Sequence, residues 1–222
     1  MDKKGYKMCY KEQMTKIIIA MSGSHSCYEI FRDFVEMSAI SIQNGCSILH
    51  DKHYKAREEK YLSIAKKYTK EELKMMCNML GLLQMALEEE MEDVLGQVYM
   101  ESGCGSKYTG QFFTPFQLAS LTAQVAIEKR NKIKLIEPST GGGAMIIGAA
   151  KALKDMGIDY QRKLEVVAQD IDWIGVYMTY VQISLLGISG IVVQGDSLCE
   201  PYHAGYDRDR MLITPMKAGA IW

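Results

Sequence analysis

The chain has 222 residues, of which 48% are apolar and 24% charged, as in an ordinary soluble globular protein. No apolar run approaches the roughly 20 residues of a membrane span, and the basic start before "IIIAM" is too soon broken to be a signal peptide. The net charge of −1 excludes a protein that holds nucleic acid by overall positive charge. Any DNA contact is therefore expected from a local patch or a partner.

The six cysteines are scattered and form no C-x-x-C pair. This pattern predicts reduced thiols in a cytoplasmic protein, without a disulfide framework or a zinc site. The four histidines show no metal-ligand spacing, so we expect no metal centre.

Residues 1–105 are predicted to form a helical domain. Ser26 with Glu29, and Thr69 with Glu72, have capping-box spacing, and apolar residues then recur at helical intervals. The methionines in these stretches fit either a core or an adaptable binding groove, and we favour the core. The Gly/Ser-rich stretch "SGCGSKYTG" marks the boundary with a second domain, residues 106–222.

The second domain is predicted to be α/β, a partial Rossmann-like sheet of about four parallel strands with crossover helices. Its strands are the apolar runs "KLIEP", "LEVVAQD", "GIVVQGD" and "RMLITP". Ligands of such sheets bind at the carboxyl ends of the strands. The polar residues at those ends are therefore expected along one rim: Glu137, Asp170, Asp172, Asp196 and Thr214.

The stretch "EPSTGGGAMII" places three glycines between a strand and a helix. It lacks the Lys-Ser or Lys-Thr of a P-loop and does not fit G-x-G-x-x-G. A carboxylate at a strand end suits ribose hydroxyls, and a helix N-terminus suits a carboxylate. A ligand with a ribose, an amino-acid head and no phosphate is S-adenosylmethionine; on spacing alone, a generic nucleotide site remains open.

Three further stretches favour S-adenosylmethionine as the ligand. In chain order they are "GQFFTP" (110–115), "EPSTGGGAMII" (137–147) and "GDSL" (195–198). Together they resemble motifs of the N6-adenine DNA methyltransferase family, in particular the modification subunits of type I restriction systems. The resemblance implies S-adenosylmethionine as cofactor and DNA as substrate, with Asp170 at the ribose and Asp196 at the adenine edge. The cofactor-binding residues that it implies are Phe113, Thr114, Pro115, Glu137, Pro138, Gly141, Gly143, Asp170, Ile171, Asp196, Ser197 and Leu198.

The chain departs from this family at the catalytic motif N-P-P-[YF]. There the Asn oxygen and a Pro carbonyl accept from the target amine, and the aromatic ring stacks on the flipped base. Thr214, Pro215 and Met216 occupy the expected position and supply no carboxamide. We therefore expect a weak or inactive enzyme on its own. The alternative is a non-catalytic cofactor-sensing or DNA-associated module, and a protein-glutamine methyltransferase is a weaker third hypothesis.

Four strands are predicted where the family's sheet has seven. The open sheet predicts a partner, either a specificity or other subunit or a second copy, unless the N-terminal helices fold back over it. We favour Asp172 as a helix cap. For Trp173, packing and a platform for adenine are equally supported.

Overall fold

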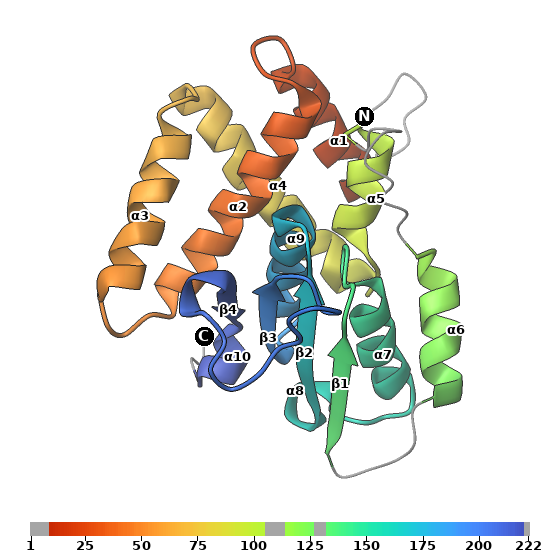
Figure 1. Cartoon of the computed structure of the whole chain (residues 1–222). Coiled ribbons are helices and arrows are strands. Elements are labelled where there is room, and N and C mark those ends of the chain that lie inside the picture. Colours follow the sequence, from red (N-terminus) through yellow and green to blue (C-terminus); the bar gives the residue numbers. More distant parts are fainter. Residues whose placement is uncertain (1–8, 105–113, 127–131, 220–222) are drawn as a thin grey trace.

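The computed structural model describes residues 9–104, 114–126 and 132–219 (Figure 1). The first half is helical, as predicted. Its helices are α1 (Tyr10–Met21), α2 (Cys27–Gly45), α3 (Lys52–Ala65), α4 (Lys70–Glu89) and α5 (Val94–Glu101).

Both predicted capping boxes are present. Glu29 N donates to Ser26 Oγ at 3.2 Å, and Ser26 N donates to Glu29 Oε2 at 3.0 Å. Thr69 and Glu72 make the same reciprocal pair, at 3.2 and 2.7 Å. These bonds satisfy amide groups that a helix start leaves unpaired, so they fix where α2 and α4 begin. Met14, Met76 and Met79 lie in the core, as favoured, whereas Met75 and Met85 of the same helical stretches are exposed.

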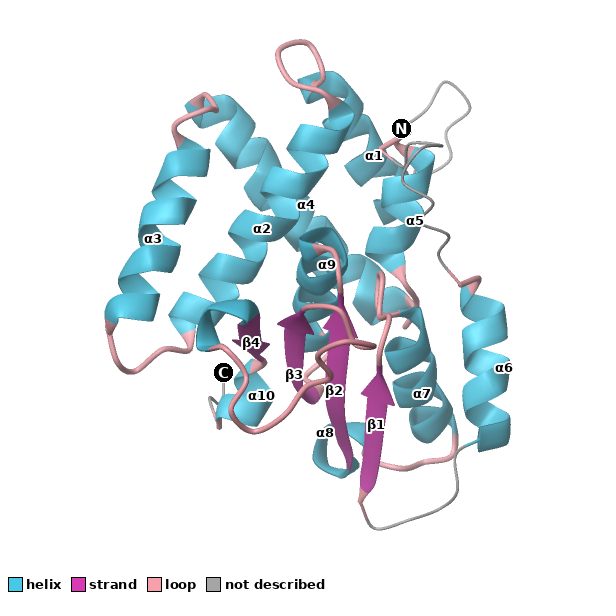
Figure 2. Cartoon of the chain, viewed as in Figure 1, coloured by secondary structure: helices cyan, strands magenta, loops and turns pink. Residues whose placement is uncertain are grey.

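The second half alternates helices and strands around one four-stranded sheet (Figure 2). Its strand order is β1-β2-β3-β4. The elements are α6 (Phe116–Ala126), β1 (Ile133–Glu137), α7 (Ala144–Asp155), α8 (Tyr160–Lys163), β2 (Leu164–Asp170), α9 (Trp173–Leu185), β3 (Ser189–Gln194), a 3-10 helix (Arg208–Arg210), β4 (Met211–Ile213) and α10 (Pro215–Ala218).

The first three strands are parallel, as predicted, but the prediction of a parallel fourth strand was wrong. β4 pairs with β3 in antiparallel fashion, with Ile213 opposite Ile191 and Met211 opposite Val193. A parallel return needs a crossover of a dozen or more residues, usually a helix. Between β3 and β4 the chain forms only a three-residue 3-10 helix, so it turns back beside β3.

Helix α9 lies between the sheet and the N-terminal helices (Figure 1). It packs on β2 and β3, and its other side meets α2, α4 and α5. One hydrophobic cluster therefore runs from Ile18 and Leu83 through Tyr180 to Val192. The division expected between residues 105 and 106 falls outside the described residues and stays a prediction.

The opposite face of the sheet carries a row of four aligned apolar residues. Ile136, Val167, Ile191 and Ile213 are neighbours in register across all four strands. None of them is fully buried, and Ile136 is 76% exposed. The N-terminal helices pack on α9, and Gln43 of α2 reaches the row at one end, where it accepts from Ile213 N at 2.8 Å. We call this row the open sheet face.

No described helix is long and apolar enough to cross a bilayer. Within the described residues, no cluster of three or more His, Cys, Asp or Glu side chains is arranged to hold a metal ion.

Candidate cofactor site

The glycine-rich loop joins the carboxyl end of β1 to the start of α7. Gly141 and Gly143 have φ values of +51° and +91°, a left-handed conformation that side chains rarely adopt. Gly143 N donates to the carbonyl oxygen of Thr140 at 2.8 Å and closes the turn. Glycine is required here because the backbone conformation, not a side chain, shapes the loop.

The loop is fixed to the neighbouring strand and helix through two threonines. Thr140 N donates to the carbonyl oxygen of Gln169 in β2 at 3.0 Å. The hydroxyls of Thr140 and Thr179 lie 3.0 Å apart, and Thr179 Oγ1 also donates to the carbonyl oxygen of Gly141 at 2.9 Å. The turn is therefore held in one geometry before any ligand binds.

Asp170 joins the second strand end to this loop. Its Oδ2 accepts from Gly141 N at 2.7 Å, and its Oδ1 accepts from Asp172 N at 2.9 Å. A Cβ at Gly175 would lie 2.7 Å from the Asp170 carboxyl carbon, so α9 approaches at a glycine. Burial raises the pKa of Asp170, against the lowering effect of these backbone bonds. Each oxygen of an ionised carboxylate has a second lone pair, which leaves acceptor capacity for ligand hydroxyls.

Glu137 is a second carboxylate at the same rim. Its Oε1 accepts from Ser139 N at 3.2 Å, and its neighbour Pro138 is exposed. Burial raises the pKa of Glu137, and repulsion from Asp170 adds to the effect. Two partly buried carboxylates this close to each other favour a ligand that carries positive charge.

The third strand end adds an exposed turn. Asp196 Oδ1 accepts from Leu198 N at 2.9 Å and from Cys199 N at 3.4 Å, and these bonds lower the pKa of Asp196. Gly195 N donates to the carbonyl oxygen of Asp170 at 2.8 Å, which ties this turn to the second strand end. Leu198, after the partly exposed Ser197, is 93% exposed, and Ile171 is 68% exposed. The rim thus offers apolar surface beside carboxylates, a combination that suits a nucleoside.

Of the "GQFFTP" stretch, the structure describes Thr114 and Pro115, and Phe113 lies outside the described residues. Thr114 and Pro115 line a cavity of about 350 Å³ together with Asp93. Asp93 also borders the glycine loop, because a Cβ at Gly142 would lie 2.3 Å from its Oδ2. Asp93 therefore lies between Thr114 and Pro115 on one side and the glycine loop on the other.

Asp172 caps α9, as favoured, by accepting from Ile174 N at 3.0 Å. Trp173 stacks on Tyr177 with ring centroids 5.1 Å apart and remains partly exposed. Packing therefore accounts for one contact of the indole and leaves part of it accessible.

Thr214 lies away from this site, because the antiparallel β4 runs toward the amino end of β3. Its Oγ1 accepts from Gly190 N at 2.9 Å and donates to the carbonyl oxygen of Ile188 at 2.8 Å. Thr214 is fully buried there, next to the buried Pro215 and the exposed Met216. The expectation that Thr214 joins Glu137, Asp170 and Asp196 on one rim was wrong.

Sequence reasoning missed Asp93 and Gln182. Gln182 Nε2 donates to Asp93 Oδ1 at 2.9 Å and to the carbonyl oxygen of Gly142 at 2.7 Å. Asp93 also accepts from Gly96 N at 2.8 Å, and burial raises its pKa. A lone Asp before an eight-residue helix signals a cap, but nothing in its spacing points to a loop about fifty residues away.

A glycine turn, a carboxylate at each of three strand ends and a largely parallel α/β sheet match a methyltransferase-like fold. The family model for N-6 DNA methylases matches residues 90–216, more than half of the chain. The chain belongs to the N-6 DNA methylase family.

Comparison with curated proteins found no match. Among solved structures, one described as a class I S-adenosylmethionine-dependent methyltransferase of Listeria monocytogenes is similar, with 12% identity and a TM-score of 0.48. That alignment covers 89% of this chain and 56% of the other, so this chain spans about half of its length.

S-adenosylmethionine is the methyl donor of the N-6 DNA methylase family, and so the cofactor of this chain. The residues present fit that group. The loop is shaped by glycines, so the backbone can come close to the methionine part, and the paired carboxylates Glu137 and Asp170 complement its positive charge.

Proposed function

We propose that the protein binds S-adenosylmethionine at the glycine loop and acts in methyl transfer to the N6 atom of adenine in DNA, within a restriction-modification type system. The observation that carries the proposal is the 2.7 Å bond from Gly141 N to Asp170. It joins the loop that would approach the methionine part to the carboxylate that would hold the ribose. Glu137, with Pro138, Gly141 and Gly143, would flank the methionine part. Ile171, Asp196, Ser197 and Leu198 would border the adenine ring, with Phe113, Thr114 and Pro115 over the cofactor.

S-adenosylmethionine supplies the methyl group, and this chain's residues bind and orient it. The acceptor amine has to be activated separately, since adenine's amino lone pair is delocalised into the ring. No Asn-Pro-Pro-aromatic sequence occurs in the 222 residues, and Thr214 hydrogen-bonds at the other end of β3. Loss of one positioned acceptor costs about 100-fold or more in rate. We therefore propose that the isolated chain transfers methyl groups slowly or not at all.

A partner would complete the enzyme, either a specificity or other subunit or a second copy. The open sheet face supports this, because parallel sheets are almost always covered on both faces. The near-zero net charge supports DNA contact through a partner or a local patch. Six free thiols support a reducing cytoplasmic location.

The alternative function is a cofactor-sensing or DNA-associated module without catalysis. The position of Thr214 favours it, because that residue uses its hydroxyl to hold β3 and β4 together.

Calorimetry with S-adenosylmethionine, on the wild type and two variants, tests the cofactor site. Asp170→Ala removes a loop contact and the ribose acceptor, and we expect a loss of about 2–4 kcal/mol in binding. Asp172→Ala, two residues away, removes a helix cap and should cost about 1 kcal/mol of stability with little change in affinity. Absence of binding by the wild type at millimolar cofactor would overturn the assignment of the site.

Quantifying N6-methyladenine in unmethylated DNA after incubation with protein and cofactor separates the enzyme from the binding module. We expect cofactor binding without detectable transfer by the chain alone. Robust transfer would show that the residues of this chain suffice and would overturn the requirement for a partner.

A further inference from the structure

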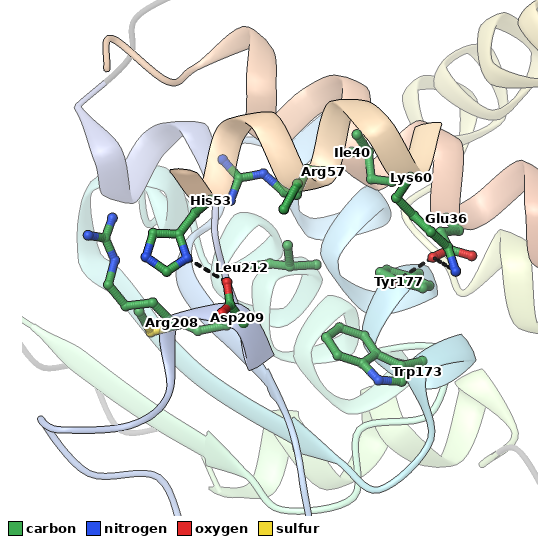
Figure 3. A pocket seen from close by; sticks show the side chains of 12 residues that line it. Glu36, Ile40, His53, Arg57, Lys60, Trp173, Tyr177, Arg208, Asp209 and Leu212 are labelled. Carbon is green, nitrogen blue, oxygen red and sulfur yellow. Dashed lines mark hydrogen bonds and ion pairs between the residues drawn. The ribbon is translucent and has the colours of Figure 1, made fainter. Parts of the chain in front are cut away.

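A second recess lies between the N-terminal helices and the α/β half. It is a cleft of two adjoining compartments, about 220 and 490 Å³, between α2 and α3 on one side and α9 and β4 on the other. Figure 3 shows the smaller compartment. The compartments share Glu36, Lys60, Trp173 and Tyr177. A cavity of this size matches small-molecule sites. Among the described residues, none of those named above for the cofactor lines it.

One wall of the cleft is aromatic. Trp173 and Tyr177 stack with their rings inclined by 27°, and both line the two compartments. Tyr177 is fixed by donating its hydroxyl to Glu36 Oε1 at 3.2 Å. Trp173 is the first residue of α9 and remains partly exposed in the cleft (Figure 3). An indole that is positioned by stacking on Tyr177 and is still partly exposed offers a surface on which an aromatic ligand ring can stack.

The other end of the cleft is cationic. Arg57 donates to two neutral acceptors, Asn44 Oδ1 at 2.8 Å and Ser47 Oγ at 3.3 Å. Among the described residues, no carboxylate lies within ion-pair distance of Arg57. Burial lowers the pKa of Arg57, attraction from Asp51 works against this, and repulsion from Arg208 adds to the lowering. Two guanidiniums that share the attraction of one carboxylate carry excess positive charge, which favours a further anion.

The acidic residues of the smaller compartment are already paired with other groups. Glu36 lies 3.6 Å from Lys60 Nζ and accepts from Tyr177. Asp209 contacts His53 at 2.5 Å. The nearest carboxylate to Arg208 is on Asp51, at 3.9 Å. Within the described chain, Asp51 attracts both Arg57 and Arg208, so the two guanidiniums of the cleft share one carboxylate.

We propose that this cleft binds a nucleotide, with the base against Trp173 and Tyr177 and the phosphate at Arg57 and Arg208. An aromatic wall and a pair of guanidiniums in one cleft match the two chemical parts of a nucleotide. The nucleotide is either a free nucleoside phosphate or part of a DNA strand. The second source rests on the proposed DNA substrate, whereas the first does not.

Trp173 gives the test its signal. Trp173 and Trp222 are the two tryptophans of the chain, so in a Trp222→Phe background the fluorescence reports on Trp173. The probes are thymidine 5′-monophosphate, a short single-stranded oligothymidylate and inorganic phosphate. Thymine keeps the probes distinct from the adenine-binding rim, and a parallel titration with S-adenosylmethionine reports on the cofactor site.

We expect saturable quenching by thymidine monophosphate if the source is a free nucleotide, and by the oligonucleotide alone if it is a strand. Arg57→Gln should weaken this binding by at least about 10-fold. Because Arg57 also bonds to α2 and to Ser47, Arg208→Gln is the second variant. Its side chain is 66% exposed, so the fold should tolerate it, and the expected loss is about 3- to 10-fold. Arg162→Gln, with a side chain 87% exposed on α8, is the control and should change nothing.

Three results would overturn the proposal. One is the absence of saturable quenching by either nucleotide probe at millimolar concentration. Another is binding of inorganic phosphate as tight as that of both nucleotide probes, which would leave no role for the aromatic wall. The third is binding unaffected by both arginine variants. In each case S-adenosylmethionine binding should persist, so this failure is distinguishable from failure of the proposed function.

Discussion

Gln182 Nε2 lies 2.9 Å from Asp93 Oδ1 and, with the same nitrogen, 2.7 Å from the carbonyl oxygen of Gly142. Gln182 Oε1 accepts from Leu95 N at 3.1 Å, so the whole amide is engaged. One fully buried side chain on α9 thus links the start of α5 to the glycine loop. The N-terminal helices therefore take part in shaping the cofactor site.

Replacing Gln182 by Leu should destabilise the protein. Leucine keeps much of the volume but leaves the Asp93 carboxylate and the Gly142 carbonyl without this donor. Leaving buried polar groups unpaired costs about 1–3 kcal/mol each. Chemical denaturation measures the effect, and calorimetry should show weaker cofactor binding. Gln84→Leu, whose exposed partner is Glu88, is the matched control and should stay within about 0.5 kcal/mol of the wild type. Equal effects of the two substitutions would contradict the role of Gln182.

Gly142→Ala should disturb the same contact from the loop side. The added methyl group would lie 2.3 Å from Asp93 Oδ2, a distance that only a backbone or carboxylate shift can relieve. Overpacking of this kind typically costs 1–3 kcal/mol. Gly81→Ala is the control, because a methyl group there has nothing within 4 Å. In a helix that change should stabilise the protein by roughly 0.5–1 kcal/mol. Thermal unfolding measures the stability of both variants. A Gly142→Ala variant as stable as the wild type would show that the loop accommodates the added methyl group.

Cofactor affinity should fall as the pH is lowered. Burial raises the pKa of both Glu137 and Asp170, so each takes up a proton at a higher pH than an ordinary carboxyl. Protonation removes the negative charge that a cationic ligand needs. The folding stability of the cofactor-free protein depends on pH in the opposite direction. These carboxyls stabilise the folded state at low pH, and that contribution is lost as the pH rises through their raised pKa values. The cofactor-induced rise in unfolding temperature should therefore grow with pH.

Calorimetry between about pH 4.5 and 7.5 checks this dependence, since ordinary Asp and Glu titrate near 3.9 and 4.3. Asp170→Asn should flatten the pH profile while it lowers affinity. A wild-type profile that stays flat down to about pH 4.5 would show that neither carboxylate contacts the cofactor.

The open sheet face should mediate association. The isolated chain is expected either to form a dimer or to bind a hydrophobic dye, because Ile136, Val167, Ile191 and Ile213 lie in one accessible row. Ile136→Lys should reduce dimer formation or dye binding, according to which of the two the wild type shows. Since Ile136 is largely exposed, stability should change by less than about 0.5 kcal/mol.

Light scattering at several concentrations, with a dye titration, measures both. Ile48→Lys is the control, because Ile48 is 96% exposed in the turn between α2 and α3. A monomer that binds no dye would mean that the face is already covered. An equal effect of both substitutions would show that general surface charge, rather than this face, is responsible.

The sequence by itself determined the local structure and the strand ends. The capping boxes at Ser26 and Thr69, and the cap at Asp172, depend on residues two or three positions apart, so spacing was sufficient to predict them. The run of three glycines between a strand and a helix likewise predicted a tight turn, and Gly141 and Gly143 have positive φ values there. Glu137, Asp170 and Asp196 were placed correctly at strand ends because each follows an apolar run.

Only the tertiary structure decided the features that depend on which segments meet. β4 is antiparallel because no crossover helix precedes it. Thr214, which follows β4, therefore lies at the amino end of β3 and not at the predicted rim. Asp93 meets Gln182 across 89 residues of chain, a pairing that no local pattern encodes. The cleft between α2, α3 and α9 likewise exists because the helices pack on α9 rather than on the open sheet face. Side chains brought together by packing leave no periodic signal, since periodicity reports the contacts within one element and not the partner of that element.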